Sequence, residues 1–379
     1  MEYTEAKEFL NSTSKYGSVL GIETIKELLK RLDNPQDKLN VVHFAGTNGK
    51  GSTMVYLESI LLCAGYSVGK YSSPAVFDEW EIITVDRTPI SKEDVATYIE
   101  KIKPICEEMV KDGLNHPTRF EIETALAFCF FADLDLDVCL IECGMGGRDD
   151  ATNVFEKNLL SVITSISLDH TKELGETIEE IKENKEAIIK RDCPAVYAGT
   201  LGSIDDINQE TAIHAAEELQ KQGFKLKKYI DEGIEQTYWP GRMETICENP
   251  LFIIDGAHNP GAILKLRDYI DLHFTNKRIT FIMGVLADKD YSEEASIIGS
   301  KAKKVYTITP NNNRGLDANK LADTMCEYNQ NTVASKTIDE AIRQAIDEVK
   351  TNESDMIIAF GSLSILKDIK EALNKILNS

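Results

Sequence analysis

The most constraining feature of this chain is a strand, a glycine-rich loop and a helix in immediate succession. The apolar run Val41–Ala45 predicts a buried strand. The loop that follows, residues 46–52, reads Gly-Thr-Asn-Gly-Lys-Gly-Ser, and residues 53–64 are expected to form a helix. Because the first amides of a helix and its dipole attract anions, this order predicts a phosphate-binding loop with Lys50 as its cation.

The loop departs from the common nucleotide-binding signature, Gly-x-x-x-x-Gly-Lys-Ser/Thr, at two positions. Phe44 stands at the first glycine, and Gly51 replaces the hydroxyl residue that would bind Mg²⁺. A plain glycine-rich turn is the alternative, but the flanking strand and helix favour a nucleotide site of a variant kind. The residues predicted to bind the nucleotide here are Gly46, Thr47, Asn48, Gly49, Lys50, Gly51 and Ser52.

Length, charge and cysteine usage narrow the class of protein. The 379 residues suffice for two domains, and the net charge of −21 argues against nucleic acid or an anionic membrane as partner. A nucleotide is also anionic, so its site must supply lysines, arginines and metal ions. The eight cysteines show no Cys-x-x-Cys pair, and we find no signal-peptide pattern and no stretch of membrane-spanning length. We therefore expect a soluble, cytoplasmic protein.

Helix and strand signals alternate along the first part of the chain. Residues 4–34 are expected to be helical, and Ser91 is placed to cap a helix over residues 92–111. Residues 199–238 show one helix, over about 206–222, and little strand signal. The remaining buried strands are predicted at 66–71, 82–85, 138–142, 160–166 and 195–198. This alternation predicts a doubly wound, mostly parallel α/β sheet.

A second alternation follows the junction Trp239-Pro240-Gly241-Arg242. Its strands are predicted at residues 251–255, 279–284, 304–308 and 356–360, with helices between them. We therefore predict an N-terminal P-loop ATP-binding domain over residues 1–240. A smaller, Rossmann-like α/β domain is predicted over residues 241–379.

Several short motifs follow one another along the chain in a fixed order. In the first part they are residues 46–52, Ser72-Ser73-Pro74, Glu142–Gly147, Asp150-Ala151-Thr152-Asn153 and Leu168-Asp169-His170. In the second they are Trp239–Arg242, Asp255–Pro260, Leu286–Asp290 and Gly361-Ser362-Leu363. This order resembles the Mur ligase superfamily, and within it the folylpolyglutamate synthase/dihydrofolate synthase branch. The resemblance covers nearly the whole chain.

The resemblance implies an ATP-dependent ligase. In that family ATP phosphorylates a carboxylate, and the amine of an incoming amino acid, usually L-glutamate, attacks the acyl phosphate. Ser73 and Glu142 would bind one Mg²⁺ and His170 a second, while Lys185 would carry a carbamate that offers oxygens to the metal. Taken alone, Lys185 would be a solvated helix residue and His170 a core or capping histidine.

The resemblance assigns further roles. Asn208, Arg242 and Asp255 would bind ATP, and His258 would join Lys50, His170 and Lys185 in the catalytic set. The residues expected to contact the acceptor or the amino acid are Glu81, Arg148, Asp150 and Ser362. Other interpretations stay open: a surface ion pair for Arg242, a turn former for Asp255 and a helix cap for Ser362.

The chain departs from the family pattern chiefly in the loop after Pro74. Ile82 stands where the family has an arginine, and the three acids and tryptophan within residues 78–81 would be an unusual lining for an anionic folate. The segment over residues 199–238 is also short for the family, and Asp149 replaces an apolar residue. These differences concern the acceptor of the reaction more than the chemistry.

The leading hypothesis is therefore a ligase that adds L-glutamate to a reduced folate, with dihydropteroate as a second acceptor. The same chemistry on a non-folate carboxylate is the first alternative, which Ile82 favours. A catalytically silent nucleotide-binding protein and a simple phosphotransferase are alternatives from other classes. The expected partners are small molecules only, namely the acceptor, L-glutamate and ATP with two Mg²⁺, and the resemblance suggests a monomer.

Overall fold

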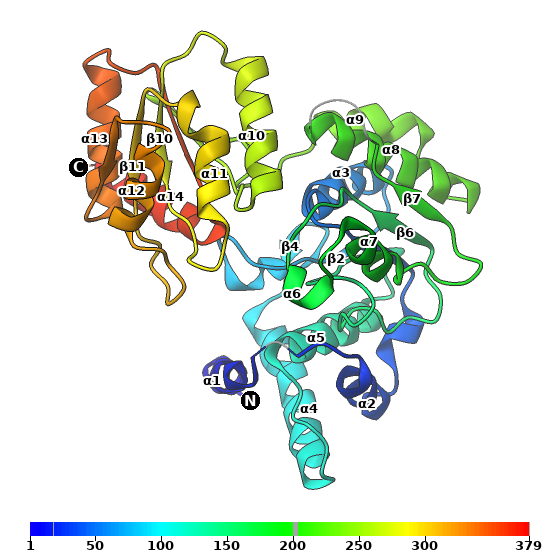
Figure 1. The fold of residues 1–379 in the computed structure, drawn as a ribbon. Helices are drawn as coiled ribbons and strands as arrows, with labels where there is room; N and C mark the ends of the chain where they lie inside the picture. Colours follow the sequence, from blue (N-terminus) through cyan, green and yellow to red (C-terminus); the bar gives the residue numbers. More distant parts are fainter. Residues whose placement is uncertain (18, 200–203, 379) are drawn as a thin grey trace. The chain divides into compact units, whose positions relative to one another are not determined.

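The computed structural model describes residues 1–17, 19–199 and 204–378, and each of its two sheets belongs to a separate part of the chain (Figure 1). The chain divides into two compact units, Met1–Tyr238 and Trp239–Ser379. This division falls immediately before the Trp-Pro-Gly-Arg junction, two residues from the boundary predicted from the sequence. The α/β class predicted from the alternation of signals is confirmed.

The first unit contains a seven-stranded sheet in the order β4-β3-β2-β5-β1-β6-β7. Five neighbouring strands, β2, β5, β1, β6 and β7, are parallel, whereas β3 runs antiparallel to both β2 and β4. The predicted, mostly parallel sheet is thus confirmed. The strands are β1 Val41–Ala45, β2 Val68–Tyr71, β3 Ile83–Val85, β4 Thr88–Pro89, β5 Val138–Glu142, β6 Leu160–Ile163 and β7 Ala195–Tyr197.

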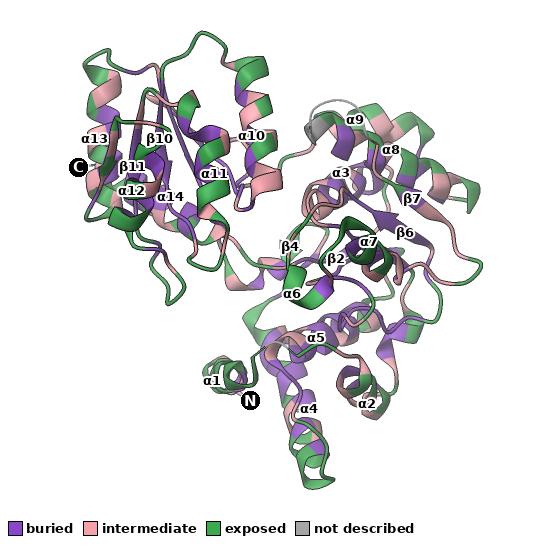
Figure 2. Ribbon diagram, viewed as in Figure 1, coloured by how far each residue is buried: buried purple, intermediate pink, exposed green. Residues whose placement is uncertain are grey.

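Helices cover both faces of this sheet, because successive strand residues enter different hydrophobic clusters. Val41 and Ile141 pack with α1, α2, α4 and α5, whereas Val42 and Leu140 pack with α3 and α8. Figure 2 shows the strands buried between exposed outer helix faces. The helices are α1 Tyr3–Thr13, α2 Glu23–Arg31, α3 Lys50–Cys63, α4 Lys92–Lys111, α5 Arg119–Leu134, α6 Thr171–Leu174, α7 Ile178–Glu186, α8 Ile204–Lys221 and α9 Ile230–Glu235.

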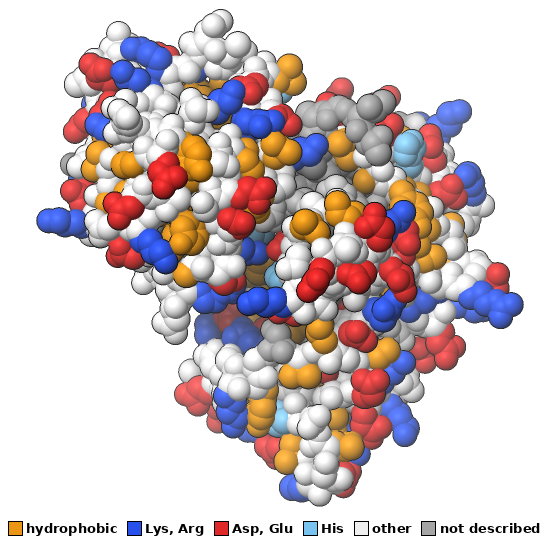
Figure 3. All heavy atoms as spheres, viewed as in Figure 1, with side chains coloured by type: hydrophobic (Ala, Val, Ile, Leu, Met, Phe, Trp, Pro, Cys, Tyr) orange, Lys and Arg blue, Asp and Glu red, His pale blue; other side chains and the backbone are white. Residues whose placement is uncertain are grey.

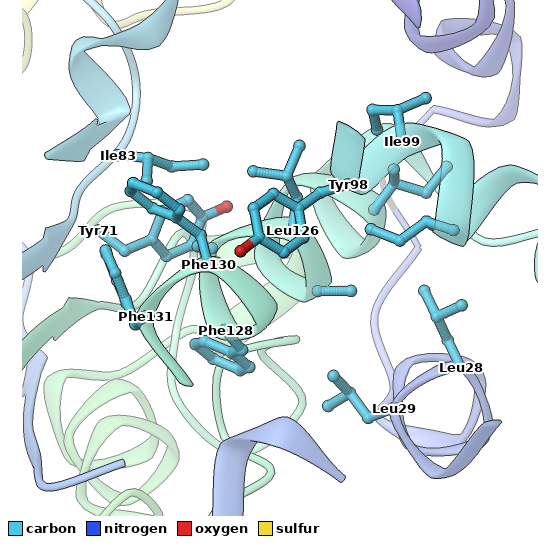
Figure 4. Packing of buried hydrophobic residues seen from close by; sticks show 14 of the residues in the cluster. Leu28, Leu29, Tyr71, Ile83, Tyr98, Ile99, Leu126, Phe128, Phe130 and Phe131 are labelled. Carbon is cyan, nitrogen blue, oxygen red and sulfur yellow. The ribbon is translucent and has the colours of Figure 1, made fainter. Parts of the chain in front are cut away.

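Helix α5 is the centre of the larger cluster in this unit. Its Phe128 and Phe131 are fully buried, and Phe130 packs edge-on against Tyr98 of α4 at 5.9 Å between ring centroids (Figure 4). The cluster also receives Leu28 from α2. Because α5 lies between the sheet and other helices, its sequence is apolar on most sides rather than along one stripe.

Helix α4 begins where the sequence predicts. The hydroxyl of Ser91 accepts a hydrogen bond from the Asp94 amide at 3.0 Å, which confirms the predicted cap of α4. Helix α3 begins earlier than expected, because Gly49 adopts the left-handed conformation and starts the helix at Lys50. The helices expected over residues 4–34 are confirmed as α1 and α2, with a break between them.

The segment before the second unit contains a helix that the sequence pattern did not reveal. Helix α9 has six residues, too few for a clear apolar period. Its Gly233 is buried against Ile60 of α3, where a Cβ atom would collide with the backbone of that residue. The prediction of a single helix in this segment is therefore wrong.

The second unit contains a six-stranded sheet in the order β12-β11-β10-β13-β9-β8. All neighbouring pairs are parallel except β8 and β9. The strands are β8 Glu244–Glu248, β9 Leu251–Ile254, β10 Ile279–Met283, β11 Lys304–Thr307, β12 Thr332–Ala334 and β13 Met356–Phe360. The sequence did not reveal β8 and β12, because edge strands are only half-buried and lack a continuous apolar run.

Both faces of the second sheet are also covered. Its buried apolar cluster contains Phe281 and Phe360, which pack edge-on at 5.0 Å, together with residues of α10, α11 and α12. Helices α13 and α14 pack against β10 and β13. The helices are α10 Pro260–His273, α11 Tyr291–Ile298, α12 Ala318–Cys326, α13 Ile338–Lys350 and α14 Leu363–Leu377. Among the described helices of both units, none has the length and apolarity needed to cross a bilayer.

Candidate active site

The loop between β1 and α3 has the tight geometry that its glycines predict. Gly46 lies so close to Thr164 that a Cβ atom there would collide with the threonine hydroxyl. Gly49 has a φ of +89° and forms the N-cap of α3. Both positions therefore require glycine, and together they direct the chain from the end of β1 into the start of a helix.

The segment after β6 holds the outer part of this loop. The amides of Thr47 and Asn48 donate to the Ser165 carbonyl at 2.8 and 3.3 Å. The Thr47 hydroxyl donates to the Ser167 carbonyl at 3.0 Å. The first amides of the loop are thus already hydrogen-bonded to the protein itself. The amides of residues 50–52 belong to the first helical turn, which has no acceptor within its own helix, and they are suited to an anion.

Two lysines converge on one carbonyl of the loop. The Nζ atom of Lys50 lies 3.0 Å from the Gly46 carbonyl oxygen, and the Nζ atom of Lys185 lies 2.9 Å from the same oxygen. The Oε1 atom of Glu142 is 3.7 Å from Lys50 Nζ. The loop, the end of β5 and helix α7 therefore meet at one point, with two cationic groups beside one carboxylate.

Lys185 lies on the buried face of α7. Ile181, one turn before it, is fully buried, and Lys185 itself is 4% exposed. Acidic side chains cover the outer faces of α6 and α7 (Figure 3). Burial first, and then the nearby Lys50 charge, lower the pKa of Lys185 from 10.5 to about 8. The alternative of a solvated helix lysine is wrong, and a neutral amine is accessible to this residue near neutral pH.

The other predicted metal ligands follow the carboxyl ends of neighbouring parallel strands. Ser73 comes after β2, Glu142 ends β5, and His170 follows β6, on both sides of the loop after β1. Such a sheet edge is where α/β proteins bind ligands. His170 begins α6 with a φ of +49°, and its Nε2 atom lies 4.0 Å from Asp169 Oδ1. His170 is thus at a helix start and not in the core.

These donors suit Mg²⁺ that is bound largely by phosphate. Within the described residues, no group of three His, Cys, Asp or Glu side chains is placed to hold a metal ion by itself. Mg²⁺ is commonly held in proteins by one or two carboxylates together with the phosphates of a nucleotide. Glu142, buried at the sheet edge beside Lys50, fits that pattern.

Asn208 of α8 is also close to the loop. It is 3% exposed, and a Cβ atom on Gly49 would collide with its side-chain oxygen. Asn208 is therefore positioned beside the start of α3. Its contact with the adenine of ATP stays a prediction.

Two residues near β5 that were predicted to contact the substrate differ in their surroundings. The Arg148 side chain is half-exposed and pairs with Glu183 at 2.8 Å. Asp150 is buried, and its carboxylate accepts hydrogen bonds from the Met145 amide at 2.7 Å and from the Thr152 hydroxyl at 2.6 Å. Desolvation raises the pKa of Asp150, an effect that these hydrogen bonds oppose. Asp150 thus holds its own loop together, and contact with a substrate remains a prediction for both residues.

A histidine that the sequence interpretation did not select lies beneath this loop. His43 of β1 is fully buried, with its Nε2 atom 2.8 Å from the Thr152 hydroxyl and 3.2 Å from Cys143 Sγ. Desolvation lowers the pKa of His43 to about 3, so the ring is neutral. Its signal in the sequence was a polar residue in the middle of a buried strand.

The loop after Pro74 is held together by its own acids. Glu81 accepts hydrogen bonds from the amides of Val76, Phe77 and Asp78. Glu79 pairs with Lys7 and Arg119, each at 2.8 Å. The carboxylates of Glu81 and Glu79 are therefore neutralised or hydrogen-bonded within the protein.

The apolar residues of the same loop are buried. Trp80 is 3% exposed and donates to the Tyr3 hydroxyl at 2.7 Å. Ile82, at the position of the family's arginine, is 5% exposed and belongs to the core of the first unit. Ile82 thus stabilises the fold here, which weakens the argument for a non-folate acceptor. Glu81 as a substrate contact stays a prediction.

In the second unit, the carboxyl end of β9 carries the predicted site residues. Asp255 accepts hydrogen bonds from the amides of Met243 and Ala257 at 3.0 and 2.8 Å. The Arg242 guanidinium lies beside Gly256, close enough to meet a Cβ atom there. The Nδ1 atom of His258 is 2.7 Å from the Gly256 carbonyl, so it donates the ring proton. The turn-former alternative for Asp255 is therefore correct in part, since its carboxylate orders the turn.

Ser362 begins α14. Its hydroxyl accepts from the Ser364 amide at 3.2 Å and lies 2.8 Å from the Ser364 hydroxyl. It is 3% exposed. The helix-cap alternative therefore describes its contacts, and the proposed contact with the amino acid stays a prediction.

Comparisons with known proteins agree with this architecture. The family model described as Mur ligase, glutamate ligase domain matches residues 241–363. The dihydrofolate synthase/folylpolyglutamate synthase of Bacillus subtilis is 31% identical, over 98% of this chain and 99% of that protein. The folylpolyglutamate synthase of Lacticaseibacillus casei is 31% identical, over 81% of this chain and 85% of that protein.

A solved structure of Escherichia coli FolC in complex with DHPP and ADP has a TM-score of 0.85 and 26% identity, and the match covers 98% of each chain. The match to the Bacillus subtilis protein spans almost the full length of both chains. It therefore includes both units, with the variant phosphate loop and the Trp-Pro-Gly-Arg junction. The chain belongs to the dihydrofolate synthase/folylpolyglutamate synthase family.

Proposed function

We propose that this protein is an ATP-dependent ligase that adds L-glutamate to a reduced folate, and that it also accepts dihydropteroate. The observation that carries the proposal is the convergence of Lys50, Lys185 and Glu142 at the loop before α3. Relatives named for both activities match the chain over almost its whole length, and the solved complex of FolC contains ADP and DHPP.

The reaction proceeds in two balanced steps. A carboxylate oxygen of the acceptor attacks the γ-phosphorus of ATP, the bond to the bridging oxygen breaks, and ADP leaves. The neutral amine of L-glutamate then attacks the acyl carbon, the amide bond forms, and inorganic phosphate leaves with the electrons of the C–O bond. The ammonium of L-glutamate loses one proton to solvent before this attack, and the amine loses a second, which leaves with the phosphate, as the amide forms.

The residues of the first unit bind and orient ATP in this proposal. The amides of residues 50–52 and the Lys50 ammonium bind the phosphates, and Asn208 contacts the adenine. Ser73 and Glu142 would hold one Mg²⁺, and His170 together with a carbamate on Lys185 would hold a second; such ions would supply positive charge for the transferred phosphoryl group. The lowered pKa of Lys185 supports the carbamate, because only the neutral amine adds to CO₂.

The residues of the second unit serve ATP and the amino acid. Arg242 and Asp255 bind ATP, and His258, whose ring is oriented by the Nδ1 contact with the Gly256 carbonyl, acts near the reacting phosphate. Ser362 holds the amino acid. All eight cysteines are free, as in proteins of reducing compartments, and we propose a monomer that works in the cytoplasm.

The test is ADP release by the purified protein with Mg²⁺, ATP and L-glutamate, with tetrahydrofolate, its 5,10-methylene form or dihydropteroate added in turn. We expect release with a pterin acceptor and a product heavier by one glutamyl unit in mass spectrometry. The variant Glu142→Gln, which keeps the side-chain shape and removes the charge, should bind the acceptor but release little ADP. ATP binding without turnover of any pterin would refute the folate assignment.

A further inference from the structure

A chain of hydrogen bonds joins the middle of β1 to the loop after β5. His43 Nε2 lies 2.8 Å from the Thr152 hydroxyl, and that hydroxyl lies 2.6 Å from Asp150 Oδ1. All three side chains are buried, with exposed fractions of 0%, 0% and 3%. The His43 ring also packs edge-on against Phe155, with 5.7 Å between the ring centroids. The ring therefore has one well-defined orientation.

The number of available protons determines which group donates in each of these hydrogen bonds. The Thr152 hydroxyl has one proton, and the shorter contact indicates that it goes to Asp150. The Nε2 atom of His43 must then be the donor, since two lone pairs would otherwise face each other at 2.8 Å. The reverse direction needs a protonated Asp150. Two backbone amides, from Met145 at 2.7 Å and Thr152 at 3.0 Å, point at this carboxyl group and favour its charged form.

The Asp150 carboxylate closes the loop that starts directly after Glu142. It links Met145 to Thr152, so the loop over residues 143–152 is tied across its base. Deleting the His43 proton donor would leave the Thr152 hydroxyl free to rotate toward other acceptors. The Asp150 carboxylate would then keep its backbone partners but lose the side chain that fixes its angle.

The same loop is bound to the helix that carries Lys185. The Arg148 amide donates to the Asn184 carbonyl at 2.9 Å, and the Asn153 side chain donates to the Ala187 carbonyl at 3.3 Å. Gly147 is so close to the backbone of residues 184–185 that a Cβ atom would not fit. A shift of the loop would therefore move α7, and with α7 the Lys185 amine at the Gly46 carbonyl.

We propose that His43 is a positioning residue of the ligase, acting through Thr152 and Asp150 on the loop that places both Glu142 and Lys185. This inference rests on the proposed function, in which those two residues serve the phosphoryl transfer. His43 itself is fully buried within the first unit, so its effect is on the geometry of the loop.

The test uses two pairs of matched variants. Thr152→Val removes the hydroxyl at nearly constant volume, and Thr152→Ser keeps it. His43→Phe removes the Nε2 donor, and His43→Gln retains an N–H donor near the same point. We expect Thr152→Val and His43→Phe to lower kcat by about tenfold or more, as for other residues that orient metal ligands. We expect Thr152→Ser and His43→Gln to stay within about threefold of the wild type.

A second measurement does not depend on the acceptor or on turnover. Mn²⁺ replaces Mg²⁺, and its binding to the protein with ADP is followed by electron paramagnetic resonance. We expect the variants Thr152→Val and His43→Phe to bind Mn²⁺ about tenfold more weakly, with rescue in the conservative partners. Lower melting temperatures with unchanged Mn²⁺ binding and unchanged kcat per folded molecule would mean a merely structural role and would overturn the proposal.

The direction of the hydrogen bonds is tested by ¹⁵N NMR of the histidine rings, with His43 assigned by its absence in His43→Gln. A proton on Nε2 supports the chain as drawn. A proton on Nδ1 alone would reverse the chain and overturn the argument, whichever acceptor the enzyme uses. If no pterin supports turnover but Mn²⁺ binding and the NMR result hold, the folate assignment fails and the positioning role stands.

Discussion

Replacing Lys185 by methionine should make the protein more stable while removing its activity. Lys185 is buried at 4% exposure, and its pKa falls from 10.5 to about 8. One pKa unit corresponds to about 1.4 kcal/mol, so the protonated side chain costs the folded state about 3 kcal/mol at neutral pH. The variant loses the hydrogen bond to the Gly46 carbonyl, worth about 1 kcal/mol. The net expectation is a gain of about 2 kcal/mol in the free energy of unfolding.

The pH dependence follows from the same numbers. Below pH 8 both the folded and the unfolded wild type carry the proton, and the full cost is present. Between about pH 8 and 10.5 the folded protein loses the proton while the unfolded chain keeps it, so wild-type stability rises relative to the variant. The advantage of Lys185→Met should therefore be full at pH 7, should fall as the pH rises above about 8, and should reverse near pH 10.5, where only the lost hydrogen bond remains.

Urea unfolding in CO₂-free buffer measures this difference. The chain has two tryptophans, Trp80 and Trp239, so a Trp239→Phe background leaves buried Trp80 to report on the first unit. Lys182→Met is the matched control, because Lys182 lies on the same helix with its side chain 52% exposed. We expect no stabilisation there. In ¹³C-labelled bicarbonate the wild type, but not Lys185→Met, should show a carbamate signal.

The reasoning fails if Lys185→Met is less stable than the wild type at pH 7. It also fails if the difference stays constant up to pH 10.5, because the cost would then not come from the charge of Lys185. Retained ligase activity in Lys185→Met would separately refute the catalytic role of this lysine.

Two further changes test the loops on either side of this site. Gly46→Ala should abolish ATP binding in isothermal calorimetry, since the added Cβ collides with Thr164 in a backbone conformation that already costs about 1–3 kcal/mol for other residues. Gly65→Ala, at a φ of +83° with no atom near the added Cβ, should bind ATP normally. Arg119→Met removes the partly buried partner of Glu79 and Glu123, worth about 1 kcal/mol, and should raise KM for the acceptor about fivefold without changing KM for ATP. Lys7→Met, which removes the more exposed partner of Glu79, is its control, and an equal effect of both changes on both KM values would contradict a local role for Arg119.

Residues that follow a strand signal were the easiest to predict. A run such as Val138–Glu142 indicates both a buried strand and its carboxyl end, and parallel strands bring such ends to one edge of the sheet. Lys185 also had a usable signal, because Ile181 lies four residues before it and Ile188 three residues after it, which is the spacing of one helical face. Lys182 falls outside that face, and the structure shows it exposed.

Contacts between distant residues could not be predicted in this way. The His43–Thr152 contact joins residues 109 positions apart, and the Lys185–Gly46 contact joins residues 139 positions apart. Helix and strand periods act over a few residues and carry no information on such pairs. For the same reason the acids of the loop after Pro74 looked like a pocket lining, although Glu79 is paired with residues of α1 and α5.

The polar groups around Gly46 also indicate what the first unit must bind. Two ammonium groups on one carbonyl repel each other, and this repulsion adds to burial in lowering the pKa of Lys185. Glu142 is closest to Lys50 at 3.7 Å, so it offsets the repulsion only in part. An anion at the start of α3 would relieve it, because a phosphate attracts the Lys50 ammonium and the helix amides at once, while the carbamate proposed for Lys185 removes the second ammonium. The positive charges around Gly46 are thus unfavourable in the protein alone and favourable in a complex with ATP. Residues selected only for the stability of the fold would not place these charges together.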